Sequence, residues 1–218
     1  MKSVNHHRSG SVAIALMLAG LLLWPAATLA QLGGLLPPST TTTTSTVVGE
    51  ASAAQVTVLG ILGTATTTAL SDTGFIGATN TEQDASQVTG SVASLLTADV
   101  LTSSTYSYID QVDSQTSLGD LSLAIGAASI TADSVVAEAS QVLGASGSGT
   151  SFIDNLAING VPVAVTGAPN QTVGIPGGQM VINEQTISST GTAVVNAIHV
   201  TVTGVADVVI ASATAGIS

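Results

Sequence analysis

Short runs of β-branched and small side chains, separated by glycine, are the feature that most constrains how this 218-residue chain can fold. Within these runs Val, Ile, Leu and Ala alternate with Thr and Ser, the two-residue period of a strand with one buried face. β-Branched residues favour the pleated geometry of a sheet, and no long amphipathic helical pattern occurs. The sequence therefore predicts an all-β fold, an antiparallel β-sandwich-like domain of short strands and hairpins.

The distribution of charge excludes several classes of function. Both basic residues, Lys2 and Arg8, lie in the first eight positions, and all 13 acidic residues follow residue 30. A chain without later cations lacks the basic footprint that nucleic acids require, so we expect no nucleic-acid partner. The chain has no cysteine, which excludes a thiol nucleophile, a disulfide and a thiolate metal site.

The N-terminal residues have the pattern of an export signal. A basic start precedes an apolar stretch of about 14 residues, then the helix-breaking Pro25 and small residues that end at Ala30. The apolar stretch is shorter than the roughly 20 residues of a spanning helix, so cleavage is favoured over an uncleaved anchor. We predict cleavage between Ala30 and Gln31, a secreted, extracellular or cell-surface location, and no membrane association after cleavage.

The rest of the chain divides into a linker and a folded domain. Residues 31–46 form a low-complexity, Thr-rich linker, and the all-β domain is predicted over 47–218. The Gly/Ser tract at 144–149 is the candidate internal boundary. Predicted strands cover 54–62, 64–70, 92–102, 105–112, 118–125, 129–139, 152–158, 161–166, 171–175, 179–187, 194–203 and 205–215. Asn159-Gly160 and Pro176-Gly177-Gly178 are the clearest hairpin turns.

The segment Asn196–Thr203 shows the strand period most plainly. Its even positions from Ile198 to Val202 are apolar, and its odd positions from His199 to Thr203 are polar. This alternation places His199, the only histidine after residue 30, on the face opposite the apolar side chains. A hydrogen-bonded strand residue is therefore the favoured interpretation of His199, over a catalytic base.

The segments NLAINGVPVAVTGAPNQTVGIPGGQMVINEQ (155–185) and VVNAIHVTVTGVADVVIASATAGI (194–217) resemble the choice-of-anchor P family of bacterial secreted and surface proteins. The family-motif positions are Asn170, Asn183, Glu184, Gln185, Asn196, His199 and Asp207. The resemblance implies an exported domain and no enzymatic activity. It includes no anchor segment after Ile217, so we expect secretion without an evident C-terminal anchor. Glu184 is expected to be partly buried and bonded to backbone, Asn183 or Gln185.

The sequence offers candidate residues for three kinds of site: a catalytic triad, a carboxylate pair and a calcium site. A Ser-His-Asp triad would have to use His199, and glycoside hydrolysis would need a carboxylate pair. The pairs considered are Glu82 with Asp84, Asp110 with Asp113, and Glu138 with Asp133. Calcium takes oxygen ligands, which makes Asp110, Asp113 and Asp120 weak candidates, although the EF-hand loop pattern is absent. The preferred interpretation has no catalytic residue, no metal and no cofactor.

The sequence therefore predicts an exported, non-enzymatic structural or interaction protein of the bacterial cell surface or extracellular matrix. Its partners would be other surface or matrix proteins or further copies of itself, paired through β-strands. Charge-poor apolar runs such as Val205–Ala213 are typical of such pairing. The alternative is a secreted binding module for a carbohydrate or small ligand, with or without calcium.

Overall fold

The computed structural model describes residues 45–60 and 64–218. The described chain forms thirteen strands and no helix, so none there is long and apolar enough to span a membrane. The strands are β1 (Val47–Leu59), β2 (Ala65–Asp72), β3 (Thr81–Val92), β4 (Leu96–Ser107), β5 (Gln111–Ile125), β6 (Ala128–Val142), β7 (Ser148–Asp154), β8 (Ala157–Ile158), β9 (Val161–Pro162), β10 (Gln171–Ile175), β11 (Gly178–Ile187), β12 (Ala193–Val202) and β13 (Ala206–Ile217).

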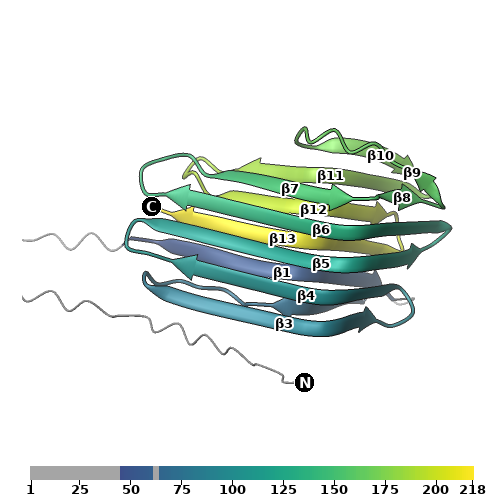
Figure 1. Ribbon diagram of the computed structural model, residues 1–218, viewed down its shortest axis with the longest axis horizontal. Helices are drawn as coiled ribbons and strands as arrows, with labels where there is room; N and C mark the ends of the chain where they lie inside the picture. Colours follow the sequence, from purple (N-terminus) through teal and green to yellow (C-terminus); the bar gives the residue numbers. More distant parts are fainter. Residues whose placement is uncertain (1–44, 61–63) are drawn as a thin grey trace, which may run out of the picture. The chain divides into compact units, whose positions relative to one another are not determined.

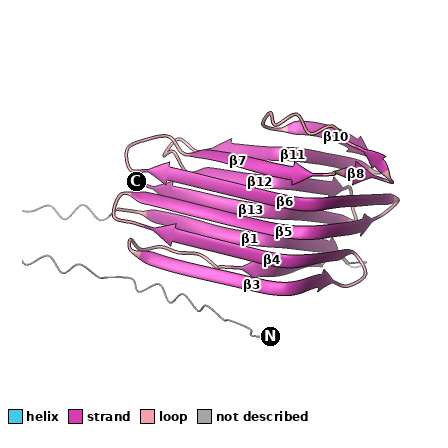
Figure 2. Ribbon diagram, in the orientation of Figure 1, coloured by secondary structure: helices cyan, strands magenta, loops and turns pink. Residues whose placement is uncertain are grey.

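These strands make two antiparallel sheets packed face to face as a β-sandwich (Figures 1 and 2). Sheet A has the order β10-β11-β12-β13-β1-β2. Sheet B has the order β3-β4-β5-β6-β8-β9, and β7 pairs with the same edge of β6 as β8 does. Strands from both ends of the chain meet in sheet A, where β1 pairs with β13 from Val47 opposite Ile217 onward. The all-β, antiparallel prediction is thus confirmed.

The core between the sheets is built from Val, Ile, Leu and Ala side chains on alternate positions of each strand. It also contains buried hydroxyls that bond each other or the opposite sheet. Ser103 Oγ lies 2.8 Å from Thr116 Oγ1, and Ser114 Oγ of sheet B donates to the Thr214 carbonyl of sheet A at 2.6 Å. These bonds satisfy polar groups that would otherwise destabilise the interior.

A crease crosses sheet A, along one row of residues where the pairing skips a position in every strand from β11 to β2. The row consists of Asn183, Ala197, Ala211, Ala53 and Ser71. Three of these residues have left-handed backbone, with φ of 52°, 53° and 47° at Asn183, Ala211 and Ser71. Buried positions are odd-numbered on one side of the row and even-numbered on the other. In β12, for example, both Val195 and Ile198 are buried.

The two predicted hairpin turns are confirmed, but the predicted strands 152–158 and 161–166 are wrong, because the first turn joins two strands of only two residues. Asn159-Gly160 joins β8 to β9 with positive φ at both positions, as a type I′ turn requires. The Pro176-Gly177 turn joins β10 to β11. The Gly/Ser tract at 144–149 lies at the β6–β7 connection within sheet B, because β7 pairs directly with β6.

Other strand boundaries were predicted wrongly. The strands are not uniformly short, since β5 and β6 each have 15 residues. The run 92–102 contains the β3–β4 turn and the run 105–112 contains the β4–β5 turn, and β3 was missed apart from Val92. The run Val205–Ala213 falls mostly in β13, which is central in sheet A and paired on both sides. The signal peptide, the Ala30–Gln31 cleavage site and residues 31–44 of the linker lie outside the described residues.

Candidate functional site

Three adjacent strands of sheet A bring His199 between two carboxylates on the outer face of the sandwich. His199 Nδ1 lies 2.9 Å from Glu184 Oε2, and His199 Nε2 lies 3.1 Å from Asp207 Oδ2. Glu184 comes from β11, His199 from the central β12, and Asp207 from β13. The His199 side chain is 23% exposed, so the prediction that it faces away from the core is confirmed.

The crease explains how residues of β12 converge on Glu184. Ala197 and Ile198 are both buried at the crease, so Asn196 and His199 point to the same outer face although they are three positions apart. Asn196 stands opposite Glu184 in the register, and its Nδ2 donates to Glu184 Oε2 at 2.7 Å. The side-chain partners of Glu184 are therefore Asn196 and His199, which corrects the expectation of backbone, Asn183 or Gln185.

The two carboxylates raise the pKa of His199. Partial burial is the largest single influence and lowers this pKa, but the hydrogen bonds that the ring makes to Glu184 and Asp207, together with their negative charges, outweigh it. Protonated imidazole donates from both ring nitrogens, and each nitrogen here has a carboxylate acceptor. When the imidazole is protonated, both of its N–H groups can donate to these carboxylates, which lie on the two strands beside β12.

This geometry does not suit nucleophilic catalysis. A Ser-His-Asp triad needs one imidazole nitrogen on the carboxylate and the other on the hydroxyl nucleophile. Both nitrogens of His199 are bonded to carboxylates. The nearby hydroxyl of Thr201 donates to Asp207 at 3.4 Å and not to the ring. The cluster therefore acts as a strand-to-strand tie in sheet A.

A second network, made by Asn170, Asn183 and Gln185, holds the loop before β10. The backbone N–H of Gln185 donates to Asn170 Oδ1 at 3.0 Å, and Asn183 Nδ2 donates to the Gly167 carbonyl at 3.0 Å. Gln185 Nε2 bonds Asn183 Oδ1 at 2.8 Å and reaches the Gly149 carbonyl of β7 at 3.0 Å. These amides connect the loop before β10, strand β11 and strand β7 of the opposite sheet.

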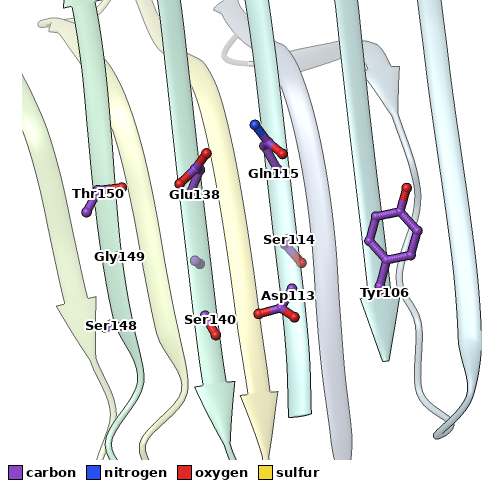
Figure 3. Close-up of a pocket in the computed structure, with 10 residues that line it drawn as sticks. Tyr106, Asp113, Ser114, Gln115, Glu138, Ser140, Ser148, Gly149 and Thr150 are labelled. Atoms are coloured by element: carbon purple, nitrogen blue, oxygen red, sulfur yellow. The ribbon is translucent and has the colours of Figure 1, made fainter. Parts of the chain in front are cut away.

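A hollow of about 350 Å³ lies on the outer face of sheet B (Figure 3). Its labelled side chains come from β4, β5, β6 and β7, with the Tyr106 ring at one end and Thr150 at the other. Asp113 and Glu138 line it from neighbouring strands, in a diagonal relation, because Asp113 faces Ser140 and Gln115 faces Glu138. An aromatic ring beside carboxylates and an amide is the chemistry that binds hydroxyl-rich ligands.

The candidate calcium residues are not brought together. Asp110 lies in the β4–β5 turn and Asp113 near the start of β5. Asp120 lies farther along β5, in its second half, and has left-handed backbone. Gln111 Nε2 bonds both carboxylate oxygens of Asp113 at 2.8 Å. Within residues 45–60 and 64–218 no group of three His, Asp or Glu side chains is placed so that it could hold a metal ion.

The three carboxylate pairs also differ in placement. Glu82 and Asp84 lie on the edge strand β3, where Tyr106 donates to Asp84 at 3.4 Å. Asp133 accepts from Asn155 Nδ2 at 2.7 Å, whereas Glu138 lines the hollow with Asp113. The pairing of Asp113 with Glu138 was missed, because only the β5–β6 register reveals it.

The fold and the two sites define a β-sandwich with a tied histidine on one outer face and a shallow polar hollow on the other. Comparison with family models, curated proteins and solved structures finds no match to the chain.

Proposed function

We propose that the chain is an exported, non-enzymatic structural or interaction protein of the bacterial cell surface or extracellular matrix. The observation that carries this proposal is the state of His199, the only histidine after residue 30, whose ring nitrogens are both bonded to carboxylates. A side chain held in this way stabilises a sheet and leaves no imidazole nitrogen for acid–base chemistry. The export pattern and the resemblance to choice-of-anchor P proteins support the same proposal.

The test is cell fractionation of a bacterial host that makes the full chain with a C-terminal epitope. We expect the chain in the medium or on the cell surface, with an N-terminus at Gln31 by mass spectrometry. Ala30→Gln should slow this cleavage, because the position before the cut requires a small residue. A chain retained in the cytoplasm with an intact N-terminus would contradict the proposal.

A second candidate function is supported by the hollow of sheet B. Tyr106 offers a ring face, and Asp113, Gln115 and Glu138 offer hydrogen-bond acceptors and donors on the same surface. These groups suit a neutral carbohydrate, because sugars present both hydroxyls and apolar C–H faces. A shallow surface of this kind suits binding and release of an extended glycan better than enclosure of a small molecule.

Titration calorimetry against a panel of oligosaccharides tests this second function. Tyr106→Ala should abolish binding, whereas Tyr108→Ala, in the adjacent turn and outside the hollow, should leave it unchanged. Titrations with calcium and with EDTA distinguish a calcium-dependent site from direct binding. If no oligosaccharide binds to the folded wild-type chain, or if Tyr106→Ala binds as well as wild type, the hollow is not a carbohydrate site.

A further inference from the structure

Strand β2 is the least protected edge in the sandwich. It ends sheet A and pairs only with β1 among the described strands. The five residues from Ala65 to Ala69 are all exposed. They include no charge and no proline, which are usual devices that prevent edge strands from pairing with other chains.

The other edges carry such devices. β10 has only five residues, and its Gln171 is bonded by the preceding loop at Thr166 and Ala164. β3 carries the charges of Glu82 and Asp84. β9 is two residues long and contains Pro162. The Gly149 carbonyl of β7 is occupied by the Gln185 amide.

The register shows which backbone groups of β2 are unpaired. Gly60 N–H donates to the Thr64 carbonyl, so these facing residues form a hydrogen-bonded pair at the start of the β1–β2 ladder. Because hydrogen-bonded and non-hydrogen-bonded pairs alternate in an antiparallel ladder, Thr66 and Thr68 bond to β1. The N–H and C=O groups of Ala65, Thr67 and Ala69 therefore point away from the sheet.

The sequence of the β2 edge is palindromic. The run Ala65-Thr-Thr-Thr-Ala69 reads the same in both directions. When two antiparallel copies meet with Thr67 opposite Thr67, Ala65 of each faces Ala69 of the other. All three facing pairs are then hydrogen-bonded pairs, each with two backbone bonds, and a two-fold axis relates the copies.

We propose that the β2 edge is a self-association surface, through which a second copy of this chain continues sheet A across a two-fold axis at Thr67. The proposal deepens the proposed function, because it names one partner of a structural protein. The occupant is a second copy because the edge is palindromic and uncharged. All 13 acidic residues lie after residue 30 without a Lys or Arg among them, so two copies repel least where their contact contains no carboxylate.

Sedimentation velocity of the chain isolated from an exporting host gives the first test. We expect a concentration-dependent species of twice the monomer mass. Thr67→Pro should abolish this species, because it removes an outward N–H that β1 does not use. Thr172→Pro is the matched control. The β10–β11 register, counted from the Pro176-Gly177 turn, shows that the Thr172 N–H points away from β11, at the opposite edge of the same sheet. It should leave the dimer intact.

Cross-linking gives a second test that does not depend on the stability of a proline variant. The chain has no cysteine, so Thr67→Cys introduces a single thiol. In the proposed pair the Cα atoms at position 67 of the two copies lie about 5.5 Å apart, within disulfide range. We expect a covalent dimer of this variant under mild oxidation. Thr66→Cys should not cross-link, because Thr66 faces Thr68 of the other copy.

The outcomes separate this inference from the proposed function. A chain that is exported but stays monomeric at high concentration overturns the β2 interface and leaves the export proposal intact. A dimer that survives Thr67→Pro, or a Thr66→Cys variant that cross-links as readily as Thr67→Cys, also overturns the interface. Retention in the cytoplasm contradicts the proposed function without bearing on the mass of the isolated chain.

Discussion

His199 Nδ1 and Glu184 Oε2, 15 residues apart in the chain, lie 2.9 Å apart on neighbouring strands of sheet A. Asp207 bonds the other ring nitrogen from the next strand, so the His199 side chain joins three strands and makes ion pairs with both neighbours when it is protonated. In a chain without Lys or Arg after Arg8, no other side chain of the sandwich can make such an ion pair.

This relationship predicts how the stability of the sandwich depends on pH. The pKa of His199 is raised in the folded chain, so its contribution is complete below the unfolded pKa of about 6.5 and is lost as pH rises through the folded pKa. His199→Gln should therefore lower the melting temperature by about 2–4 °C at pH 6, the effect of about 1 kcal/mol in a chain of this size. Near pH 9 the two proteins should melt much closer together. A constant difference between pH 6 and pH 9 would contradict the charged tie.

Substitution of Glu50 should have the opposite effect on the melting temperature to substitution of His199, although both groups lose stability as the pH rises. Burial raises the pKa of the Glu50 carboxyl, and the negative charge of Asp72 raises it further. The folded state therefore holds the proton more tightly, and stability falls as pH rises from the unfolded pKa through the folded one. Glu50→Gln should raise the melting temperature at pH 7 by about 1–2 °C, since Glu50 is partly exposed and the effect is screened. At pH 3.5 the gain should vanish. A variant less stable than wild type at pH 7 would refute this assignment.

Gln141 is predicted to be the most important polar side chain of the interior. It is 2% exposed, and its Nε2 donates to the carbonyls of Ala145 and Thr190 while its Oε1 accepts from Ile217 N–H. Gln141→Leu leaves these buried groups without partners and should cost about 3 kcal/mol. Urea denaturation should show a lower midpoint with an unchanged slope. Gln115→Leu, on the exposed face of β5, serves as the control and should stay within about 0.5 kcal/mol of wild type.

The absence of late cations predicts tolerance of acid. Protonation of the carboxylates at low pH removes negative charge, and no Lys or Arg after Arg8 leaves a large positive charge behind. The charge repulsion that unfolds many proteins in acid is therefore small here. We expect the β-sheet circular dichroism signal of the exported chain to persist at pH 3. Cooperative loss of the signal above that pH would contradict the prediction.

The alternation of buried and exposed side chains could be predicted from the sequence within strand segments that no crease or bulge interrupts. The outward position of His199 and the Asn159-Gly160 and Pro176-Gly177 turns were predicted correctly, because backbone sterics and two-residue periodicity are local properties. Strand β3 was missed because its polar residues and Gly90 hide the period of an edge strand. The turn near Tyr108 was missed because the aromatic and apolar residues around it resemble a strand.

The sequence by itself determined the all-β class, the lack of disulfides and late cations, and the face on which His199 lies. Only the tertiary structure decided that Glu184 and Asp207 flank it, that Asp113 and Glu138 share a hollow, and that β2 ends the order of described strands in sheet A while β13 is central. The physical reason is that side-chain period is set along one strand, whereas register, the parity reversal at the crease and the order of strands are set by packing between segments far apart in the chain.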